Sequence, residues 1–336
     1  MVAKTNSQPL RVGILGAGQA GERNAVGFAH SADCQLRAVC DIDVAKARAL
    51  AERFGAAAFD DWETMLEQPL DILVVALPHA LHVAPARAAA AQGIHVLMEK
   101  PLATTLKDAH TIIDACKDAG VLLTISFVHR FREEVKQAKS WLDTGKLGTP
   151  QLARSVMNGQ RGAHLPAWVT NRDLAGGGVL MYSAIHEIDR LRWLLGQEVT
   201  RVHAHTHHYD PTSEVEDSVT ALLEFTNSSA TLTTSAPVFP SLPLWETEII
   251  GDAGILRVQT RHHAMLSNHH TQTTIDTQRV AQEQGVHYNF ARQAQAFIDA
   301  ILGRAELAIT ADDGLKALEV ALALYASAEQ KQPVSV

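Results

Sequence analysis

A glycine-rich stretch near the N-terminus constrains the fold of this chain more than any other feature. The segment Gly16-Ala-Gly-Gln-Ala-Gly21 directly follows the apolar residues Val12, Ile14 and Leu15. Such a run is typical of a buried parallel strand, and the glycines allow a tight turn into a helix that a pyrophosphate can approach closely. The free N–H groups and the dipole of the helix N-terminus favour a diphosphate there. We therefore predict that a dinucleotide binds at Gly16, Ala17, Gly18, Gln19, Ala20 and Gly21.

The acidic residue that follows this turn supports the same prediction. A second apolar run, Leu36–Cys40, ends at Asp41, about 20 residues after Gly21. An acid at this spacing accepts hydrogen bonds from the adenosine ribose, and the next residue, Ile42, is not an arginine that would bind a 2′-phosphate. NAD is therefore the expected cofactor and NADP is disfavoured. The alternative is a glycine turn in another kind of α/β protein.

The pattern of the chain predicts an α/β protein of two domains. In residues 1–128, strands at 71–77, 95–98 and 121–127 alternate with helical patterns, which is typical of a Rossmann domain with a doubly wound parallel sheet. In residues 129–336, strand-like runs follow one another without crossover helices, which predicts an α+β domain with a large open, mostly antiparallel sheet. Its helices are expected at 179–195, 288–301 and 312–329, the last able to pack back on the first domain and capped by Thr310 with Asp313.

Composition restricts the partners and the compartment. The net charge of −8 argues against a nucleic-acid surface, and the apolar fraction of 46% describes a soluble globular protein. The chain has no run of about 18 apolar residues and no signal peptide, and Met1–Pro9 is a short polar segment expected to be disordered. The cysteines, Cys34, Cys40 and Cys116, show no metal-ligand spacing, so a reducing, cytoplasmic location is expected.

Four further segments resemble those of the glucose–fructose oxidoreductase/inositol dehydrogenase (Gfo/Idh/MocA) family. They are Val74-Val-Ala-Leu-Pro-His79 with His82, Gly93-Ile-His-Val-Leu-Met-Glu-Lys-Pro-Leu102, Gly176-Gly-Gly-Val-Leu-Met-Tyr-Ser-Ala-Ile-His-Glu-Ile-Asp189, and Glu216-Asp217 before a strand.

The resemblance implies an enzyme that oxidises or reduces sugars, polyols or their derivatives with NAD or NADP. It also implies a large sheet that forms a homodimer or homotetramer, a functional lysine at Lys100, a functional histidine at His186 and a plausible cis bond at Pro101. Beyond the glycine turn, the expected cofactor site comprises Asp41, Ile42, Leu77, Pro78, His79, His82, Glu99, Lys100 and Pro101.

Position and chemistry favour the same lysine. Lys100 follows an apolar run, at the carboxyl end of a predicted parallel strand, where ligands of doubly wound sheets bind. Its ammonium group would hydrogen-bond a substrate oxygen and stabilise negative charge as C–OH becomes C=O. The alternative is a solvated surface lysine.

Three polar residues share one face of the predicted helix 179–195. Tyr182, His186 and Asp189 are spaced by four and seven residues, and a histidine suits proton transfer to or from a sugar hydroxyl. The alternative for His186 is a buried histidine bonded to the backbone. Many relatives have an aspartate where this chain has Tyr182, and a phenol with a pKa near 10 cannot simply replace a carboxylate base. We expect His186 to move the proton and Tyr182 to hydrogen-bond the substrate or to shape the pocket.

Other residues complete the predicted substrate site or are set aside. Besides Lys100, Tyr182 and His186, the expected substrate contacts are Arg130, Asn158, Trp168 and Asp189. No metal site is predicted, because His203, His205 and His207 share a strand face without a carboxylate or cysteine to complete a ligand set. His262-His263 and His269-His270 are expected in an exposed loop.

Three functions stay open on the sequence alone. The first is a dehydrogenase or reductase that exchanges a hydride between NAD and a carbinol or carbonyl carbon of a sugar-like substrate. The second uses the same step transiently, with the bound NAD recycled, to epimerise or cleave a glycoside. The third is a non-catalytic NAD-binding regulatory protein, which Tyr182 favours and which Lys100 and His186 argue against.

Overall fold

The computed structural model describes residues 8–160, 165–237, 242–269, 271–285 and 287–336. The chain divides into two compact units: residues 1–128 with 286–315, and residues 129–285 with 316–336. The sequence placed the boundary at the same point but assigned residues 286–315 to the second domain, and the structure differs there. Residues 1–7, for which disorder was predicted, lie outside the described residues. So does His270, for which an exposed loop was predicted.

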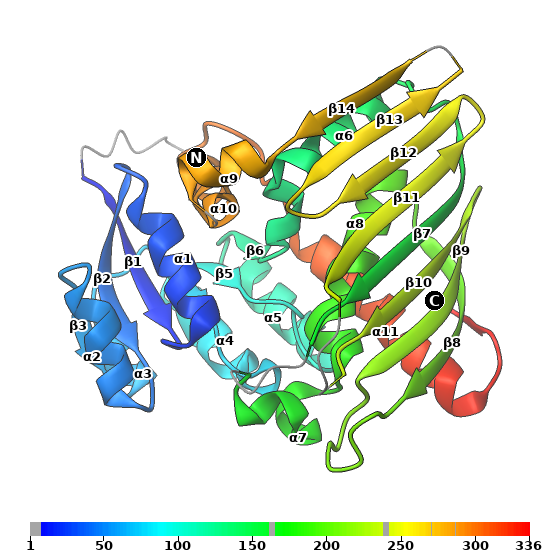
Figure 1. The fold of residues 1–336 in the computed structure, drawn as a ribbon. Helices are drawn as coiled ribbons and strands as arrows, with labels where there is room; N and C mark the ends of the chain where they lie inside the picture. Colours follow the sequence, from blue (N-terminus) through cyan, green and yellow to red (C-terminus); the bar gives the residue numbers. More distant parts are fainter. Residues whose placement is uncertain (1–7, 161–164, 238–241, 270, 286) are drawn as a thin grey trace. The chain divides into compact units, whose positions relative to one another are not determined.

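The described part of the first unit contains a parallel sheet of six strands in the order β3-β2-β1-β4-β5-β6 (Figure 1). This is the doubly wound order with its switch point beside β1. The predicted Rossmann sheet is therefore confirmed, and β3, a partly exposed strand, is the one the sequence did not indicate. The strands are β1 (Leu10–Leu15), β2 (Cys34–Cys40), β3 (Ala57–Phe59), β4 (Ile72–Val75), β5 (His95–Met98) and β6 (Leu123–Ile125).

Helices pack on this sheet, and some of them begin at a side-chain cap. Asp43 accepts from the N–H groups of Ala45 and Lys46, and Thr105 accepts from the N–H of Asp108. The helices are α1 (Gln19–Ala29), α2 (Val44–Glu52), α3 (Trp62–Leu66), the short η1 (His79–Leu81), α4 (Val83–Ala91), α5 (Leu106–Asp118) and α10 (Tyr288–Ile301).

The late helix α10 completes the core of the first unit. It packs against α1 so closely that a Cβ on Gly27 would lie 2.8 Å from the carbonyl carbon of Phe290. Ala294, Phe297 and Ile298 of α10 join the buried cluster formed by β1, β2 and α1. This contact explains why residues far along the sequence belong to the dinucleotide-binding unit.

The described residues of the second unit form a nine-stranded sheet in the order β14-β13-β12-β11-β7-β10-β9-β8-β15 (Figure 1). β7 and β10 pair in parallel and the other neighbours are antiparallel, as predicted. The strands are β7 (Pro150–Asn158), β8 (Val199–His207), β9 (Ser218–Phe225), β10 (Ser229–Ser235), β11 (Leu244–Gly251), β12 (Gly254–Gln259), β13 (His263–Asn268), β14 (Gln272–Asp276) and β15 (Val334–Ser335). His263 therefore begins a strand, although the sequence indicated a loop.

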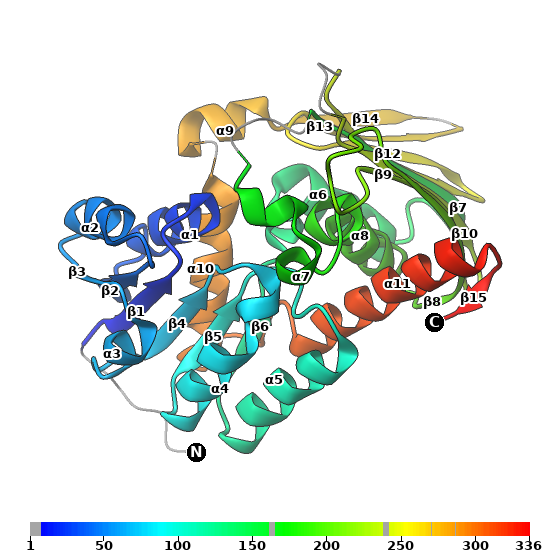
Figure 2. The ribbon, with the colours of Figure 1, turned by 90° about the horizontal axis from the view of Figure 1, so that it is seen from below.

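Helices cover one face of this sheet, and among the described residues no helix covers the other. Figure 2 shows α6 (Glu133–Asp143) and α8 (Ile185–Leu195) on the same side of the strands. Along β8, Val202 and Ala204 are buried, whereas His203 and His205 point to the opposite face. The remaining helices are η2 (Val128–Phe131), η3 (Ala167–Thr170), α7 (Arg172–Ala175), the π-helix η4 (Leu180–Ala184), α9 (Gln278–Gln284) and α11 (Ala311–Gln330), which begins in the first unit and ends in the second.

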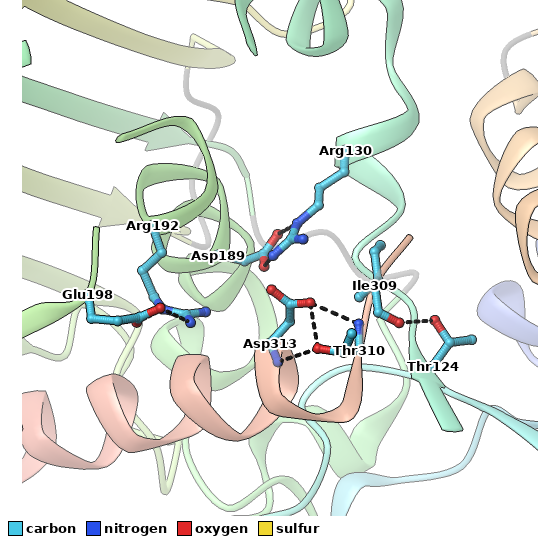
Figure 3. Close-up of polar contacts among 8 residues, drawn as sticks. All are labelled: Thr124, Arg130, Asp189, Arg192, Glu198, Ile309, Thr310 and Asp313. Carbon is cyan, nitrogen blue, oxygen red and sulfur yellow. Dashed lines mark hydrogen bonds and ion pairs between the residues drawn. The ribbon is translucent and has the colours of Figure 1, made fainter. Parts of the chain in front are cut away.

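Two further expectations concern α11 and the membrane. Thr310 and Asp313 form the predicted capping box, in which each side chain accepts from the other residue's N–H, at 2.8 and 3.2 Å (Figure 3). Within the described ranges, none of the helices has both the length and the apolar character to cross a membrane.

Candidate active site

The turn between β1 and α1 has the geometry that a dinucleotide phosphate requires. Gly16 has φ of +97°, and a Cβ there would lie 2.2 Å from the carbonyl oxygen of Ala76. A Cβ on Gly21 would lie 1.8 Å from the carbonyl oxygen of Gly16. Gly18 is different, because among the described residues no atom lies within 4 Å of such a Cβ and the residue is exposed. Two glycines are thus needed for packing, and the third leaves open space where a pyrophosphate would bind.

The first residues of α1 are available to that phosphate. Gln19 is exposed, and Ala17 and Ala20 are half-buried. In the described structure no side chain caps the helix at Gly18, so its first N–H groups are not taken by a capping oxygen. These residues fit NAD: they would hold its diphosphate on backbone N–H groups.

Asp41 lies at the end of β2 and is already fixed against the glycine turn. One carboxylate oxygen accepts from the N–H of Ala17 at 2.8 Å, and the other accepts from the N–H of Asp43 at 2.9 Å. Each oxygen keeps a lone pair that a ribose hydroxyl can use. Ile42 follows with 96% of its surface exposed.

The loops that follow β4 and β5 are joined by His82. Nε2 of its fully buried ring lies 3.1 Å from the carbonyl oxygen of Leu77, and Nδ1 lies 3.3 Å from that of Leu102. Burial lowers the pKa of His82, so the neutral ring donates to one of these carbonyls at a time. Leu77 and Pro78 are half-buried, and His79 is buried beside the His82 ring. His82 therefore fixes both loops of the predicted cofactor site.

Lys100 lies just after β5 and precedes the predicted cis peptide bond to Pro101, which the structure contains. Loss of hydration lowers the pKa of Lys100 to about 8, with nearby Arg23 acting in the same direction and Glu99 opposing it. Such a lysine is charged at neutral pH but close to its titration point. That behaviour is typical of a functional lysine rather than of a solvated one.

Glu99 is held by a buried polar network within the first unit. Asn24 of α1 donates to its carboxylate at 2.9 Å. Gln293 of α10 donates to the Ser126 hydroxyl at 3.1 Å and to the side-chain Oδ1 of Asn24 at 3.4 Å. The segment that precedes Lys100 is therefore positioned from two helices. Gln293 gave no signal in the sequence, because nothing there shows that α10 packs on this unit.

In the second unit, Glu216 fixes the start of the helix that carries Tyr182 and His186. Its carboxylate accepts from the N–H groups of Gly178 at 2.9 Å and Leu180 at 3.0 Å, and from the hydroxyl of Tyr325 at 2.7 Å. A Cβ on Gly178 would lie 1.8 Å from the Glu216 carbonyl oxygen. The helix begins as a π-turn, in which the N–H of Ile185 bonds to the carbonyl of Leu180, where the sequence predicted a regular helix. Such π-turns are frequent at functional sites.

Two predicted site residues lie on this π-turn and the following helix beside other rings. Tyr182 is half-buried, and its ring lies edge-on to Trp168, with 6.3 Å between the centroids. The His186 ring lies 4.5 Å from that of His129, which in turn lies 4.2 Å from the Trp245 ring. His186 is thus set among rings, on the helix that Glu216 caps.

Three other predicted substrate contacts have protein partners. Arg130 and Asp189 form a buried pair with two hydrogen bonds, of 3.0 and 2.5 Å (Figure 3). Asn158 ends β7 and accepts from the Ser235 hydroxyl at 3.0 Å. Roles of these residues in substrate binding stay predictions, and the contacts seen give all three a part in fixing the fold.

The histidines of β8 lie apart from these residues on the uncovered sheet face. The His203 and His205 rings are 5.5 Å apart. Over the residues whose placement is described, no group of three or more His, Cys, Asp or Glu side chains is arranged to hold a metal ion.

Comparison with known proteins covers nearly the whole chain. A family model described as an oxidoreductase family with an NAD-binding Rossmann fold matches residues 10–127. The model of the same family's C-terminal alpha/beta domain matches residues 139–336. The chain belongs to the Gfo/Idh/MocA oxidoreductase family. The resemblance read from the sequence is confirmed, and so is an NAD-binding first domain.

Individual relatives agree with the Gfo/Idh/MocA assignment. The D-glucoside 3-dehydrogenase of Escherichia coli (strain K12) is 30% identical over 352 residues, which cover 98% of each chain. The structure of GenD2 from gentamicin A biosynthesis in complex with NAD is 25% identical, with a TM-score of 0.87 over 100% of this chain and 99% of that one. Levoglucosan dehydrogenase in complex with NADH and L-sorbose, 23% identical, has the same fold, with a TM-score of 0.90 over 98% of this chain and 99% of that one.

Proposed function

We propose that this oxidoreductase transfers a hydride between NAD and a carbinol or carbonyl carbon of a sugar, polyol or sugar derivative. The observation that carries the proposal is Lys100, a lysine with a pKa of about 8 at the carboxyl end of a strand in an NAD-binding sheet. The D-glucoside 3-dehydrogenase of Escherichia coli, which aligns over 98% of both chains, supports a sugar-like substrate.

The proposed roles follow from the chemistry of each group. NAD, when bound, supplies the hydride acceptor or donor. The Lys100 ammonium hydrogen-bonds the substrate oxygen and stabilises the negative charge that develops on it. His186 takes the hydroxyl proton during oxidation and returns it during reduction. Tyr182 and Trp168 contact the same substrate, and the phenol donates a hydrogen bond to it.

The experiment is a panel of sugars, polyols and glycosides assayed with NAD and with NADP. We expect NADH formation with NAD and at least one substrate of this class. Product formed without net NADH would instead indicate the recycled-cofactor reaction, and tight NAD binding without turnover would indicate a regulatory protein.

On a confirmed substrate, His186→Ala should lower kcat by about 10²–10⁴-fold while NAD binding is retained. Tyr182→Phe removes one hydroxyl and should cost roughly tenfold if the phenol donates to the substrate. Undiminished turnover of His186→Ala would contradict the assignment of the proton carrier and would favour Tyr182.

We also propose that the protein is a homodimer or homotetramer of the cytoplasm. Leu152, Leu222 and Ile255 lie on the uncovered face of the nine-stranded sheet with 45%, 42% and 41% of their surfaces exposed, which favours burial against a second copy. The free thiols of all three cysteines favour a reducing compartment.

A further inference from the structure

A buried polar network lies behind His186 in the second unit. Glu187 and Arg190, on the same helix, are 0% and 1% exposed, and their charged groups approach to 3.7 Å. The Glu187 carboxylate accepts from the Ser155 hydroxyl and from the Trp245 indole N–H. The opposite charges of Glu187 and Arg190 offset one another within this buried network.

The network reaches His129 through Arg190. The guanidinium lies 3.4 Å from the hydroxyl of Thr247 and, with its other terminal nitrogen, 3.4 Å from Nδ1 of His129. Both separations are at the long end of the hydrogen-bond range. Arginine has donors only, so Nδ1 of His129 must be the acceptor in this contact. The hydrogen of the neutral His129 ring is therefore on Nε2.

The adjacent rings of His129 and His186 raise the question of which one takes a proton. With 4.5 Å between their centroids, the two imidazoles cannot both be protonated without strong repulsion. Protonation of His129 at Nδ1 would also place an N–H against the N–H of Arg190. Burial holds the pKa of His129 well below the ordinary value, and the nearby positive charges of His186, Arg132, Arg190 and Arg261 act in the same direction. The Glu187 carboxylate is the nearby negative charge. It already pairs with Arg190 and accepts hydrogen bonds from Ser155 and Trp245.

We propose that His129 is a positioning residue, held in one neutral tautomer by Arg190, which directs the proton of the histidine pair to His186. The inference rests on the proposed function, in which His186 moves the substrate proton. In this role, His129 packs against the His186 ring and stays neutral, so that His186 is the histidine that takes the proton.

The direct test is NMR of the full-length protein with ¹⁵N-labelled histidine, between pH 5 and 9, with signals assigned by His129→Asn and His186→Ala. We expect His129 to stay neutral throughout, with a pyridine-like Nδ1 and a protonated Nε2. An Nδ1-protonated ring, or a His129 that titrates before His186 as the pH falls, would overturn the proposal. This readout does not depend on turnover, so it stands apart from the activity of His186→Ala.

The functional test uses Arg190→Met, with Arg190→Lys as the matched variant that keeps the charge. Loss of the cation should make protonation of the pair easier and move the acidic limb of the kcat profile to higher pH by about one unit. Arg190→Lys should leave the limb near its wild-type position. A folded Arg190→Met protein with an unmoved limb would contradict the proposal. If that variant fails to fold, the double variant Glu187→Gln/Arg190→Met removes both charges. Its acidic limb should still move to higher pH, by less than one unit, because Arg190 is the member of the pair that contacts the His129 ring.

Discussion

At the scale of single residues, the environment of Lys100 determines a pH dependence. Its pKa of about 8 means that the ammonium is present below pH 8 and is lost as the pH rises above it. If the cation binds the substrate oxygen, kcat/KM should be level between the acidic limb set by the histidine pair and about pH 8, and should then fall about tenfold per pH unit. Initial rates measured between pH 6 and 10 check this.

The matched variant is Lys100→Arg, which stays charged across that range. Its rate should be lower because the fork-shaped group is differently placed, but the descending limb should disappear. A wild-type kcat/KM that rises above pH 8 would mean that the neutral amine acts as the base.

Asp41 makes a separate prediction about the cofactor. Because its carboxylate is fixed beside the glycine turn by the N–H groups of Ala17 and Asp43, it should bind ribose hydroxyls and repel a 2′-phosphate. NAD should bind more tightly than NADP, and Asp41→Ala should narrow the difference. Calorimetry with both cofactors measures this, with the exposed Glu67→Ala as a control outside the cofactor site. If the wild-type protein bound NADP more tightly than NAD, Asp41 would not select the cofactor in this way.

At the scale of elements, the cap formed by Glu216 holds the helix of the proposed proton carrier. Glu216→Ala leaves the N–H groups of Gly178 and Leu180 and the Tyr325 hydroxyl without their acceptor, and should lower the free energy of unfolding by about 2–3 kcal/mol. Tyr325→Phe removes one of these bonds and should cost about 1–2 kcal/mol. Urea titrations measure both, with the exposed Glu67→Ala as control; equal stability of all three variants would show that the cap contributes nothing.

The sequence predicted those elements whose pattern is local. The glycine turn, the capping box of Thr310 and Asp313 and α10 (Tyr288–Ile301) follow from residues that are neighbours in the chain. β14 was missed because this edge strand is almost entirely exposed and has no apolar alternation to reveal it. The π-turn was missed because it depends on Glu216, which lies 38 residues after Gly178.

The residues of the candidate site are likewise of two kinds: those in short local motifs and those that only packing brings together. Lys100 and His186 stand in short motifs, so the chain reveals them directly. His129 is 61 residues from Arg190, and no periodicity links it to Glu187 or Trp245. Only the packing of η2 and β11 against α8 brings these groups together. The available signal for this network was Glu187, directly after His186, because a glutamate that becomes buried in a helix needs a partner for its charge.

At the scale of the whole molecule, the uncovered sheet face predicts an assembly. Leu222→Glu places a charge on a face that would meet its copy, so the mass measured by light scattering should fall to the 36.4 kDa of a single chain. The matched control is Leu106→Glu in the first unit, where the leucine is 38% exposed. A wild-type protein that already has the single-chain mass at micromolar concentration would refute the assembly.

The discontinuous first unit has a consequence for synthesis on the ribosome. Residues 1–128 emerge early, but α10, with Phe297 and Ile298 of its core, is translated only after the whole nine-stranded sheet apart from β15. Until then the apolar surface of α1 and β1 lacks its cover, so the nucleotide-binding unit cannot reach its final stability. The growing chain must therefore protect that surface, by its own transient contacts or by a chaperone, for most of the time that translation takes.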